Sequence, residues 1–489
     1  MDKHERHAAT PLLFRRSHPA LPGILGAMDL RDVVRQTAER IAEYRASVAE
    51  RPVAGAVDLD AVRQRLGVVL GDQPLPADVV IERLAAAVEP ALVATIGPRY
   101  FGFVVGGALP AATCADLLAT GWDQPAFNAT TSPGAAVVEE VAGGWLKEVL
   151  GLPPDASFGL VTGCQAANTV GLAAARHHVL SRAGWDVEAQ GLRNAPPVRV
   201  LAGAERHATI DRSLRLLGFG SGVVEEVPAD ANGGMQTARL AEALDRGSPG
   251  PSIVCLQAGN VNTGACDDLA AGCEAAHRHQ AWVHVDGAFG LWAAASPATR
   301  VLTNGVEQAD SWATDGHKWL NVSYDSGYIF CAHPDSHAAA MSLTAAYLVG
   351  QANRAGGTRA PSDFVPESSR RARGFATWAA LCELGRRGVA ELVERCCARA
   401  RQFADSLSRV DGVTVANAVV LNQVLVGFGD DERTDRVIAA VQRDGTCWMG
   451  GTTWRGKRLM RISVSNWTAT ESDIDWSVAA IDRILKEER

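Results

Sequence analysis

The stretch of sequence that decides the fold is ADSWATDGHKWLNVSYDSGYIFC (residues 309–331), which follows a shorter stretch, HVDGAFG (residues 284–290). In the longer stretch, Lys318 stands between a histidine and the apolar pair Trp-Leu. Apolar neighbours indicate a dry pocket, where a lysine amine is more easily neutral and can attack a carbonyl group. A lysine with a buried stem and a solvated ammonium gives the same local pattern, so Lys318 alone does not decide between the two.

Asp286 changes the balance between these interpretations. It ends the apolar run AWVHVD, where a carboxylate without a partner would be costly. Its partner could be a metal, an arginine or a protonated ring nitrogen. A carboxylate beside a pyridine nitrogen keeps that nitrogen protonated, so that the ring accepts electrons. A lysine for the aldehyde and an acid for the pyridinium are what a pyridoxal 5′-phosphate (PLP) site needs.

The turn VTGCQAAN (residues 161–168) is the candidate for a phosphate site, because it joins a predicted strand to a helix. Backbone N–H groups at the start of a helix attract an anion. The turn is not a P-loop, since it lacks the Gly-Lys-Ser/Thr ending. His207 follows another predicted strand and opens a helix, so its ring could stack on a flat cofactor, cap the helix or face water.

The composition is that of an ordinary globular protein. Apolar residues make up 47% and charged residues 21% of the 489 positions, which argues against disordered and fibrous classes. The net charge of −8 argues against a broad basic face for nucleic acid. We find no apolar run long enough for a membrane and no signal-peptide core, and we expect a cytoplasmic protein. The ten cysteines form no Cys-x-x-Cys pair, and we expect no metal site.

Short β-branched runs alternate with helical segments through the middle of the chain. Strands are predicted at FGLVTG, VRVLAG, PSIVCLQAG, AWVHVD and SGYIFCA, with helices between most of them. This alternation predicts an α/β fold with a mostly parallel sheet. Such sheets bind ligands at the carboxyl ends of their strands, and the segments LAG, QAG and VDG lie at such ends.

Changes in pattern divide the chain into three parts. We predict an N-terminal helical segment over 1–95, a large cofactor-binding domain over 96–365 and a small C-terminal α/β domain over 366–489. Residues 341–366 contain glycine and proline and show little periodicity. A long irregular loop of this kind is often a lid, with a solvated linker as the alternative.

Taken together, these motifs resemble the group II PLP-dependent decarboxylases of fold type I, the aspartate aminotransferase-like fold. That group includes the aromatic L-amino acid, histidine, glutamate and diaminobutyrate decarboxylases. The similarity extends from PRYFGFVVGG at residue 98 to TTWRGKRLMRISVSNWTAT near the C-terminus. The stretches containing Asp286 and Lys318 are its most specific part. The resemblance implies decarboxylation of an L-amino acid with PLP as cofactor.

The resemblance also implies roles for residues at matching positions. Lys318 would form the Schiff base with PLP, and Asp286 would bind the pyridinium nitrogen. His207 would stack on one face of the ring and Ala288 would pack on the other, while His317 matches the histidine that precedes the lysine. The remaining implied cofactor contacts are Gly163, Cys164, Gln165 and Asn260.

Further positions bear on the substrate and the outcome. Tyr347, in TAAYL, resembles the mobile-loop tyrosine of the aromatic decarboxylases, which is linked to protonation of the α-carbon. Relatives with phenylalanine there tend toward aldehyde-forming chemistry, so tyrosine favours simple decarboxylation. Tyr100 and Phe103 lie in segments that border the site in relatives, which favours a hydrophobic or aromatic substrate, with core packing as the alternative. A substrate carboxylate could meet one of four arginines, Arg370, Arg371, Arg373 and Arg461.

The sequence departs from the family pattern beside the lysine. The family often has Asn-Pro-His-Lys, whereas this chain has Asp-Gly-His-Lys at residues 315–318. An aspartate near a phosphate repels it unless the side chain turns away or is paired. Thr314 or the backbone could replace the usual asparagine, and Asp315 is therefore left out of the predicted site.

Other outcomes on the same scaffold stay open from the residues alone. These are oxidative decarboxylation to an aldehyde, aminotransfer, carbon–carbon cleavage and, as another class, a non-catalytic PLP-binding protein. Members of the family assemble as homodimers with active sites at the interface and N-terminal helices that embrace the partner. The N-terminal segment here is too thin to fold alone, so we expect the same assembly, with an amino acid as the small-molecule substrate and no nucleic-acid or membrane partner.

Overall fold

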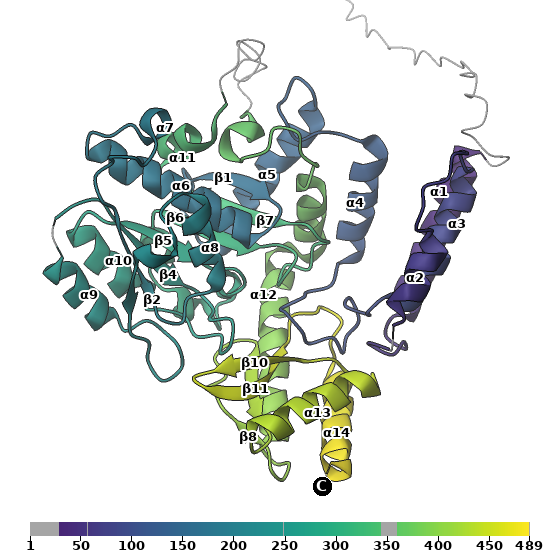
Figure 1. The fold of residues 1–489 in the computed structure, drawn as a ribbon. Helices are drawn as coiled ribbons and strands as arrows, with labels where there is room; N and C mark the ends of the chain where they lie inside the picture. Colours follow the sequence, from purple (N-terminus) through teal and green to yellow (C-terminus); the bar gives the residue numbers. More distant parts are fainter. Residues whose placement is uncertain (1–28, 56, 248, 344–358, 489) are drawn as a thin grey trace, which may run out of the picture. The chain divides into compact units, whose positions relative to one another are not determined.

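The structure, a computed structural model, describes residues 29–55, 57–247, 249–343 and 359–488. Tyr347 and most of the predicted lid lie outside the described residues. The chain forms two compact units (Figure 1). The first consists of the residues up to Glu50 together with Gly55–Val93, and the second of Arg51–Ala54 together with Ala94–Arg489.

The first unit consists of helices with almost no core of their own. Among the residues of these helices only Ala87 is buried. Apolar side chains such as Leu30 and Val34 are more than half exposed, and Leu84 is about half exposed. Amphipathic helices of this kind need a further apolar surface to become stable. The helices are α1 (Leu30–Ser47), α2 (Leu59–Leu66) and α3 (Ala77–Val88).

The second unit is built on a seven-stranded sheet. The strands are β1 (Ser157–Val161), β2 (Arg199–Gly203), β3 (Val224–Val227), β4 (Ser252–Gln257), β5 (Trp282–Asp286), β6 (Ser311–Asp315) and β7 (Gly327–Cys331). Their order is β1-β7-β6-β5-β4-β2-β3. Only β7 runs against its neighbours, and the other pairs are parallel. The mostly parallel α/β fold predicted from the sequence is confirmed.

Helices cover both faces of this sheet. The helices of this part of the chain are α4 (Pro110–Trp122), α5 (Pro133–Leu150), α6 (Cys164–Arg182), α7 (Val187–Gln190), α8 (Ala208–Leu216), α9 (Thr237–Arg246), α10 (Leu269–Arg278), α11 (Pro334–Met341) and α12 (Gly374–Leu407), of which α4 packs on α12 and α7 on α6. In β4, Ile253 and Cys255 pack with α6 and α8, whereas Val254 and Leu256 pack with α9, α10 and α12. Burial on both faces explains the continuous apolar character of β4.

The chain after α12 forms a smaller layer around an antiparallel sheet of order β10-β11-β9-β8. Its elements are β8 (Thr414–Val415), β9 (Gln423–Gly427), α13 (Asp431–Asp444), β10 (Gly450–Trp454), β11 (Lys457–Ser463) and α14 (Glu471–Glu487). The long helix α12 is interrupted at Gly385, where φ is 61°. No helix in the described part of the chain has the length and apolar content of a membrane span.

Asp310 ties three elements together just before β6. It accepts the backbone N–H of Val283 at 2.7 Å, and its oxygens lie 2.8 Å from Nε2 of His333 and 3.1 Å from Nε2 of His277. Burial by itself raises the pKa of Asp310, but hydrogen bonds from both histidines and from Val283 lower it to about 2. The hydrogen bond with Asp310 raises the pKa of His277.

We predict that Asp310→Asn lowers the free energy of unfolding by about 1 kcal/mol near pH 5 and by less above about pH 8. The raised pKa of His277 contributes stability below its ordinary value of 6.5, which is lost as the pH rises through the folded-state value. The lowered pKa of Asp310 contributes stability above its ordinary value of 3.8, which is lost as the pH falls toward about 2. Both histidines are more than a third exposed, so solvent screening keeps the effect small. Denaturant melts at the two pH values measure the difference, and equal losses at both would contradict it.

Candidate active site

The carboxyl edge of the large sheet gathers the residues that the sequence singles out. Asp286 is the last residue of β5, and Lys318 follows the end of β6. Gly163 follows β1, and His207 follows β2. Because β1, β2, β5 and β6 run in the same direction, their carboxyl ends lie at one edge of the sheet.

Lys318 is paired with a carboxylate that the sequence prediction left out of the site. Its Nζ lies 3.1 Å from Oδ2 of Asp315, whose side chain is 3% exposed. Burial lowers the pKa of Lys318, but the charge of Asp315, with further contributions from Cys164 and Asp286, gives a net pKa above the ordinary value. The expectation that a dry pocket favours the neutral amine is therefore wrong, because the ion pair outweighs desolvation.

Asp286 is buried at the end of β5, where its side chain has three weak hydrogen bonds from described residues. Its oxygens lie 3.3 Å from the N–H of Ala288, 3.4 Å from Sγ of Cys164 and 3.5 Å from Oγ1 of Thr209. No lysine, arginine or histidine in the described part of the chain forms an ion pair with it. Charge-assisted hydrogen bonds are shorter than these contacts, so the carboxylate retains capacity for a cationic N–H donor.

The backbone is closely packed where α6 begins. The N–H of Cys164, the first residue of α6, donates to Oδ1 of Asp315 at 2.6 Å. A Cβ on Gly327 would collide with the backbone of Gly163, and a Cβ on Gly163 would lie 3.1 Å from Cε1 of His317. Two neighbouring glycines are therefore required by close approach of the chain to itself. Burial, then the charges of nearby carboxylates, raises the pKa of the Cys164 thiol.

A chain of hydrogen-bonded polar side chains contacts His207 and Asp286. Nδ1 of His207 accepts the N–H of Thr209 and lies 2.8 Å from its Oγ1, so the histidine caps α8. Oγ1 of Thr209 accepts from Nδ2 of Asn168 at 3.2 Å, and Oδ1 of Asn168 lies 3.0 Å from Nε2 of the buried His284. Burial lowers the pKa of His207. The helix cap is confirmed, whereas stacking on a cofactor stays a prediction.

Aromatic side chains lie around His317 and Tyr100. Tyr324 stacks on His317 with ring centroids 4.2 Å apart, and Tyr100 stacks on Trp448 at 5.0 Å. The pKa of Tyr100 is raised to about 12, first by burial and then by Tyr324. Phe103 is mostly exposed and tilts against Trp448 at 5.6 Å. Both residues predicted for the substrate therefore lie in one aromatic group.

Three of the four candidate arginines bind carboxylates within the chain. The pairs are Arg370–Glu139 at 2.6 Å, Arg371–Asp116 at 2.8 Å and Arg373–Asp325 at 2.7 Å. Arg461 differs, because its hydrogen bond, at 3.4 Å, is to the backbone oxygen of Val261 and no described carboxylate forms an ion pair with it. Burial lowers the pKa of Arg461, partly offset by Tyr100. Its charge also acts on His207.

Two predicted cofactor contacts have side chains that bond to nearby parts of the fold. Oδ1 of Asn260 accepts the N–H groups of Asn262 and Thr263, and so shapes the turn after β4. Nε2 of Gln165 donates to Ser213 at 2.9 Å, while its buried Oε1 has no hydrogen-bond partner among the described residues. A role for either residue in binding the cofactor stays a prediction.

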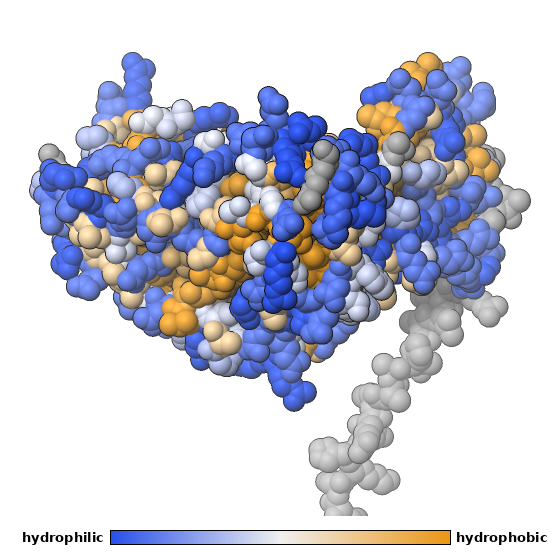
Figure 2. Space-filling view, turned by 90° about the horizontal axis from the view of Figure 1, so that it is seen from below, coloured by the Kyte–Doolittle hydropathy of each residue, from blue (hydrophilic) through white to orange (hydrophobic). Residues whose placement is uncertain are grey.

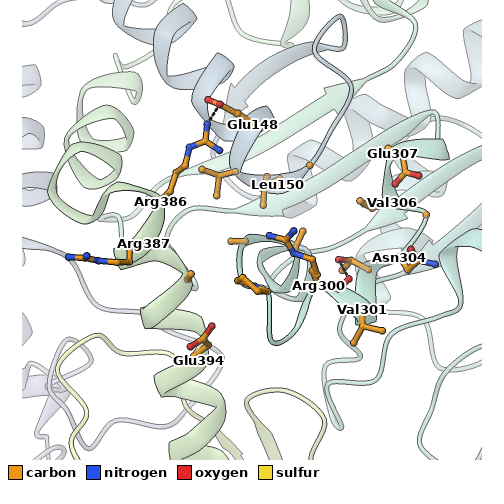
Figure 3. A pocket seen from close by; sticks show the side chains of 18 of the residues that line it. Glu148, Leu150, Arg300, Val301, Asn304, Val306, Glu307, Arg386, Arg387 and Glu394 are labelled. Carbon is orange, nitrogen blue, oxygen red and sulfur yellow. Dashed lines mark hydrogen bonds and ion pairs between the residues drawn. The ribbon is translucent and has the colours of Figure 1, made fainter.

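A cavity of about 1000 Å³ lies elsewhere, between α5, α12 and the segment 294–307. Figure 3 shows charged side chains on its wall, with Arg386 paired to Glu148. Arg387 and Glu391 form another pair, and Glu394 accepts from a serine hydroxyl. Because the residues of the Lys318 site do not line this cavity, its size does not make it the reaction site.

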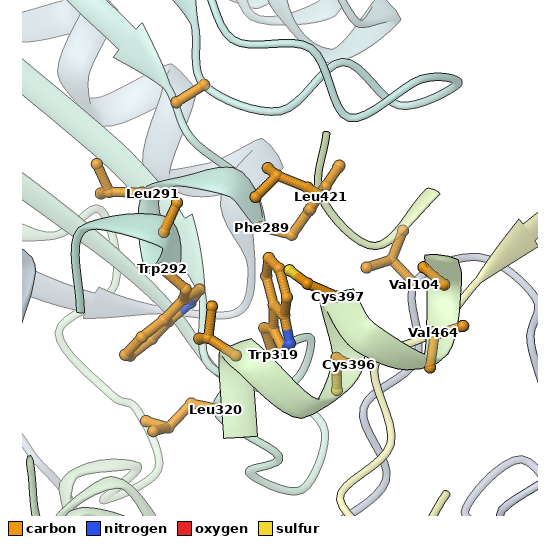
Figure 4. Packing of buried hydrophobic residues seen from close by; sticks show 14 of the residues in the cluster. Val104, Phe289, Leu291, Trp292, Trp319, Leu320, Cys396, Cys397, Leu421 and Val464 are labelled. Atoms are coloured by element: carbon orange, nitrogen blue, oxygen red, sulfur yellow. The ribbon is translucent and has the colours of Figure 1, made fainter. Parts of the chain in front are cut away.

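The backbone of Lys318 is fixed by its neighbours rather than by its charge. The next residue, Trp319, is 1% exposed and lies in the apolar core, where Figure 4 shows it close to Phe289 and Cys397. The ring centroids of Trp319 and Phe289 are 6.3 Å apart. On the other side, the chain at Gly106 passes so close that a Cβ there would collide with the carbonyl oxygen of Lys318.

These residues fit a pyridoxal cofactor. Lys318 offers a buried amine, Asp286 a buried carboxylate with unused capacity, and α6 begins beside them with a backbone donor. The departure is Asp315, which already accepts that first N–H. A lysine, a carboxylate and a helix start at the carboxyl edge of a parallel sheet define a PLP-dependent enzyme of fold type I.

A model of the pyridoxal-dependent decarboxylase conserved domain matches residues 61–428, and the chain belongs to this family. Tryptophan decarboxylase 1 of Oryza sativa subsp. japonica is 27% identical over 470 residues, which cover 90% of this chain and 91% of that protein. Phenylacetaldehyde synthase of a Rosa hybrid cultivar is 26% identical, covering 76% and 74%. The crystal structure of Oryza sativa TDC with PLP and tryptamine has a TM-score of 0.87 at 25% identity, covering 95% of this chain and 99% of that one. The protein is a PLP-dependent amino acid decarboxylase, a lyase.

The structure adds residues that sequence reasoning missed. Asp315 contacts both Lys318 and the start of α6, although its charge had argued against including it. Thr209 and Asn168 carry no signal in the sequence, because serine, threonine and asparagine are common at helix starts. Arg461 was considered, but only the missing acidic partner distinguishes it from the other three arginines.

We predict that Gly106→Ala disrupts the site more than the fold, because the added Cβ must displace the carbonyl of Lys318. Overpacking of this kind costs about 1–3 kcal/mol, and the displaced lysine should bind PLP more weakly. Gly144→Ala, where an added Cβ in α5 meets nothing within 4 Å, is the control. Thermal melts and PLP titrations measure the two effects. Unchanged PLP binding in Gly106→Ala would show that the contact does not position Lys318.

Proposed function

We propose that the protein decarboxylates an aromatic L-amino acid to the amine and carbon dioxide, with PLP attached at Lys318. The observation that carries the proposal is the meeting of Lys318, Asp286 and the start of α6 at one sheet edge. The aromatic group around Tyr100 supports an aromatic substrate. The rice relative named tryptophan decarboxylase 1 and the rice structure containing tryptamine support the same substrate class.

Each residue of the site has its own proposed role toward the cofactor. When bound, PLP supplies an aldehyde for amines and a ring that accepts the electron pair of the breaking bond. Lys318 provides the amine that holds the aldehyde. Asp286 presents a fixed negative charge to the ring nitrogen, and contacts from Thr209 and Cys164 orient its carboxylate. Burial lowers the pKa of His207, which favours a neutral imidazole able to lie against a flat ring.

We assign Arg461 to the α-carboxylate of the substrate. It is a half-buried cation whose charge acts on His207, and no described carboxylate forms an ion pair with it. Holding the carboxylate fixes the orientation of the bonds at the α-carbon relative to the cofactor ring. That orientation selects the bond that breaks, and the pair Tyr100 and Trp448 would border the side chain of the substrate.

An aldehyde-forming reaction is the second candidate function. It is favoured by the similarity to a protein named phenylacetaldehyde synthase. Tyr347 favours decarboxylation instead, because the resemblance links a tyrosine at this place to protonation of the α-carbon. Tyr347 lies outside the described residues, so its role rests on that resemblance alone.

We predict that the purified protein with PLP releases carbon dioxide and an amine from at least one aromatic amino acid in a panel of protein and common non-protein amino acids. Lys318→Ala should lower kcat by about 10³-fold or more, since it removes the group that holds the cofactor. Lys457→Ala, at an exposed position in β11, is the matched control. Aldehyde, ammonia and hydrogen peroxide as products would support the second candidate. No product across the panel, or full activity without Lys318, would contradict both.

We also propose that the protein is a homodimer with active sites at the interface. The helices of the first unit have almost no buried residues, and Leu30, Val34 and Leu84 remain exposed. The second unit exposes an aromatic pair, Trp145 and Trp378, with ring centroids 6.2 Å apart. The face seen in Figure 2 carries a patch of hydrophobic residues bordered by hydrophilic ones. Exposed apolar surfaces of this kind mark interaction sites.

We predict that sedimentation of the full chain gives the mass of a dimer at micromolar concentration. Leu84→Arg and Trp378→Arg should raise the dissociation constant at least about tenfold, because they place a charge in the buried core of the interface. Leu216→Arg, at an exposed position in α8, is the control and should leave the dimer intact. A monomeric wild-type protein would contradict the assembly.

We also propose that the protein is located in the cytoplasm. All ten cysteines of the chain are free thiols. Free thiols in this number are typical of a reducing compartment. Adjacent Cys396 and Cys397 are both buried in α12, where they serve as small apolar residues.

A further inference from the structure

Asp315 has the central position in the site. Its Oδ1 accepts the N–H of Cys164 at 2.6 Å and lies 3.5 Å from Nε2 of His317. Its Oδ2 lies 3.1 Å from Nζ of Lys318, and its side chain is 3% exposed. One buried carboxylate therefore binds both the lysine of the site and the first backbone donor of α6.

The backbone donor is also what the phosphate of PLP would use, whereas Lys318 would hold the aldehyde. Helix α6 is 19 residues long, and the N–H groups of its first turn carry the partial positive charge that attracts an anion. A phosphate and a carboxylate repel each other strongly when both are removed from water. A phosphate can accept the N–H of Cys164 only if Asp315 releases it. The aspartate and the phosphate therefore compete for one donor.

We propose that Asp315 is an internal competitor for the phosphate of the cofactor and so sets how tightly this chain binds PLP. The proposal rests on the proposed function, because it takes the start of α6 as the phosphate site. An asparagine at this position is a neutral acceptor that does not repel the phosphate when it releases the N–H of Cys164, and it offers an N–H of its own to the phosphate. Aspartate offers a negative charge instead. With aspartate the protein binds PLP more weakly than it would with asparagine. The fraction of the protein that carries PLP therefore depends more strongly on the PLP concentration.

The test compares two ligands that differ only in the phosphate. PLP and pyridoxal are titrated into the full-length protein after removal of the cofactor, with equilibrium dialysis and tryptophan fluorescence as readouts. In Asp315→Asn the Kd for PLP should fall about tenfold or more. The loss of the ion pair with Lys318 changes the reaction with the aldehyde of both ligands alike. The Kd for pyridoxal should therefore change much less than the Kd for PLP.

Two further variants make the comparison decisive. Asp310→Asn removes a carboxylate just before the same strand, where its partners are His277, His333 and Val283, and it should change neither Kd. Asp315→Ser removes the charge with a smaller side chain and should also tighten PLP. Circular dichroism confirms that each variant is folded.

An unchanged or higher Kd for PLP in both variants of Asp315 would overturn the proposal, as would equal tightening of PLP and pyridoxal. Failure of the proposed function has a different signature. In that case borohydride reduction of the wild-type protein loaded with PLP would leave the peptide containing Lys318 unmodified in mass spectra.

Discussion

The rest of the site depends on the buried ion pair of Lys318 with Asp315, to which the charge of Asp286 also contributes. Burial lowers the pKa of Lys318, and the attraction of the lysine to these carboxylates outweighs that effect. One lysine does not balance two acids, and burial lowers the pKa of His207 and His317. A protonated pyridine nitrogen beside Asp286, as we propose for bound PLP, would supply a further positive charge to the site.

The fold holds these charges in place through its backbone. Parallel strands bring the ends of β1, β2, β5 and β6 to one edge, although the residues there are far apart in sequence. The core around Trp319 and the close approach of Gly106 then fix the lysine itself. Because the backbone at Lys318 is already fixed on both sides, less conformational freedom is lost when its side chain reacts. This is the pre-organisation that catalysis needs.

The two units of the chain differ in how their apolar surface is used. The second unit buries both faces of its large sheet and continues the same core into the C-terminal layer. The helices of the first unit keep large apolar side chains at the surface. Their amphipathic pattern is therefore better explained by a surface that these helices cover than by a core of their own.

The sequence by itself determined the class of fold and the chemistry. Strands such as β4 and β5 were predictable because burial on both faces leaves continuous apolar runs, and the combination of Lys318 and Asp286 is rare without a pyridoxal cofactor. The strand β6, SWATD, was not predictable, since it mixes polar and apolar residues whose burial comes from both neighbouring strands. Only the tertiary structure decided the pairing of Asp315 with Lys318 and the lack of an acidic partner for Arg461 among the described residues. Asp315 is only three residues from Lys318, but the local pattern does not show which way its side chain turns, and the surroundings of Arg461 depend on segments far away in the sequence.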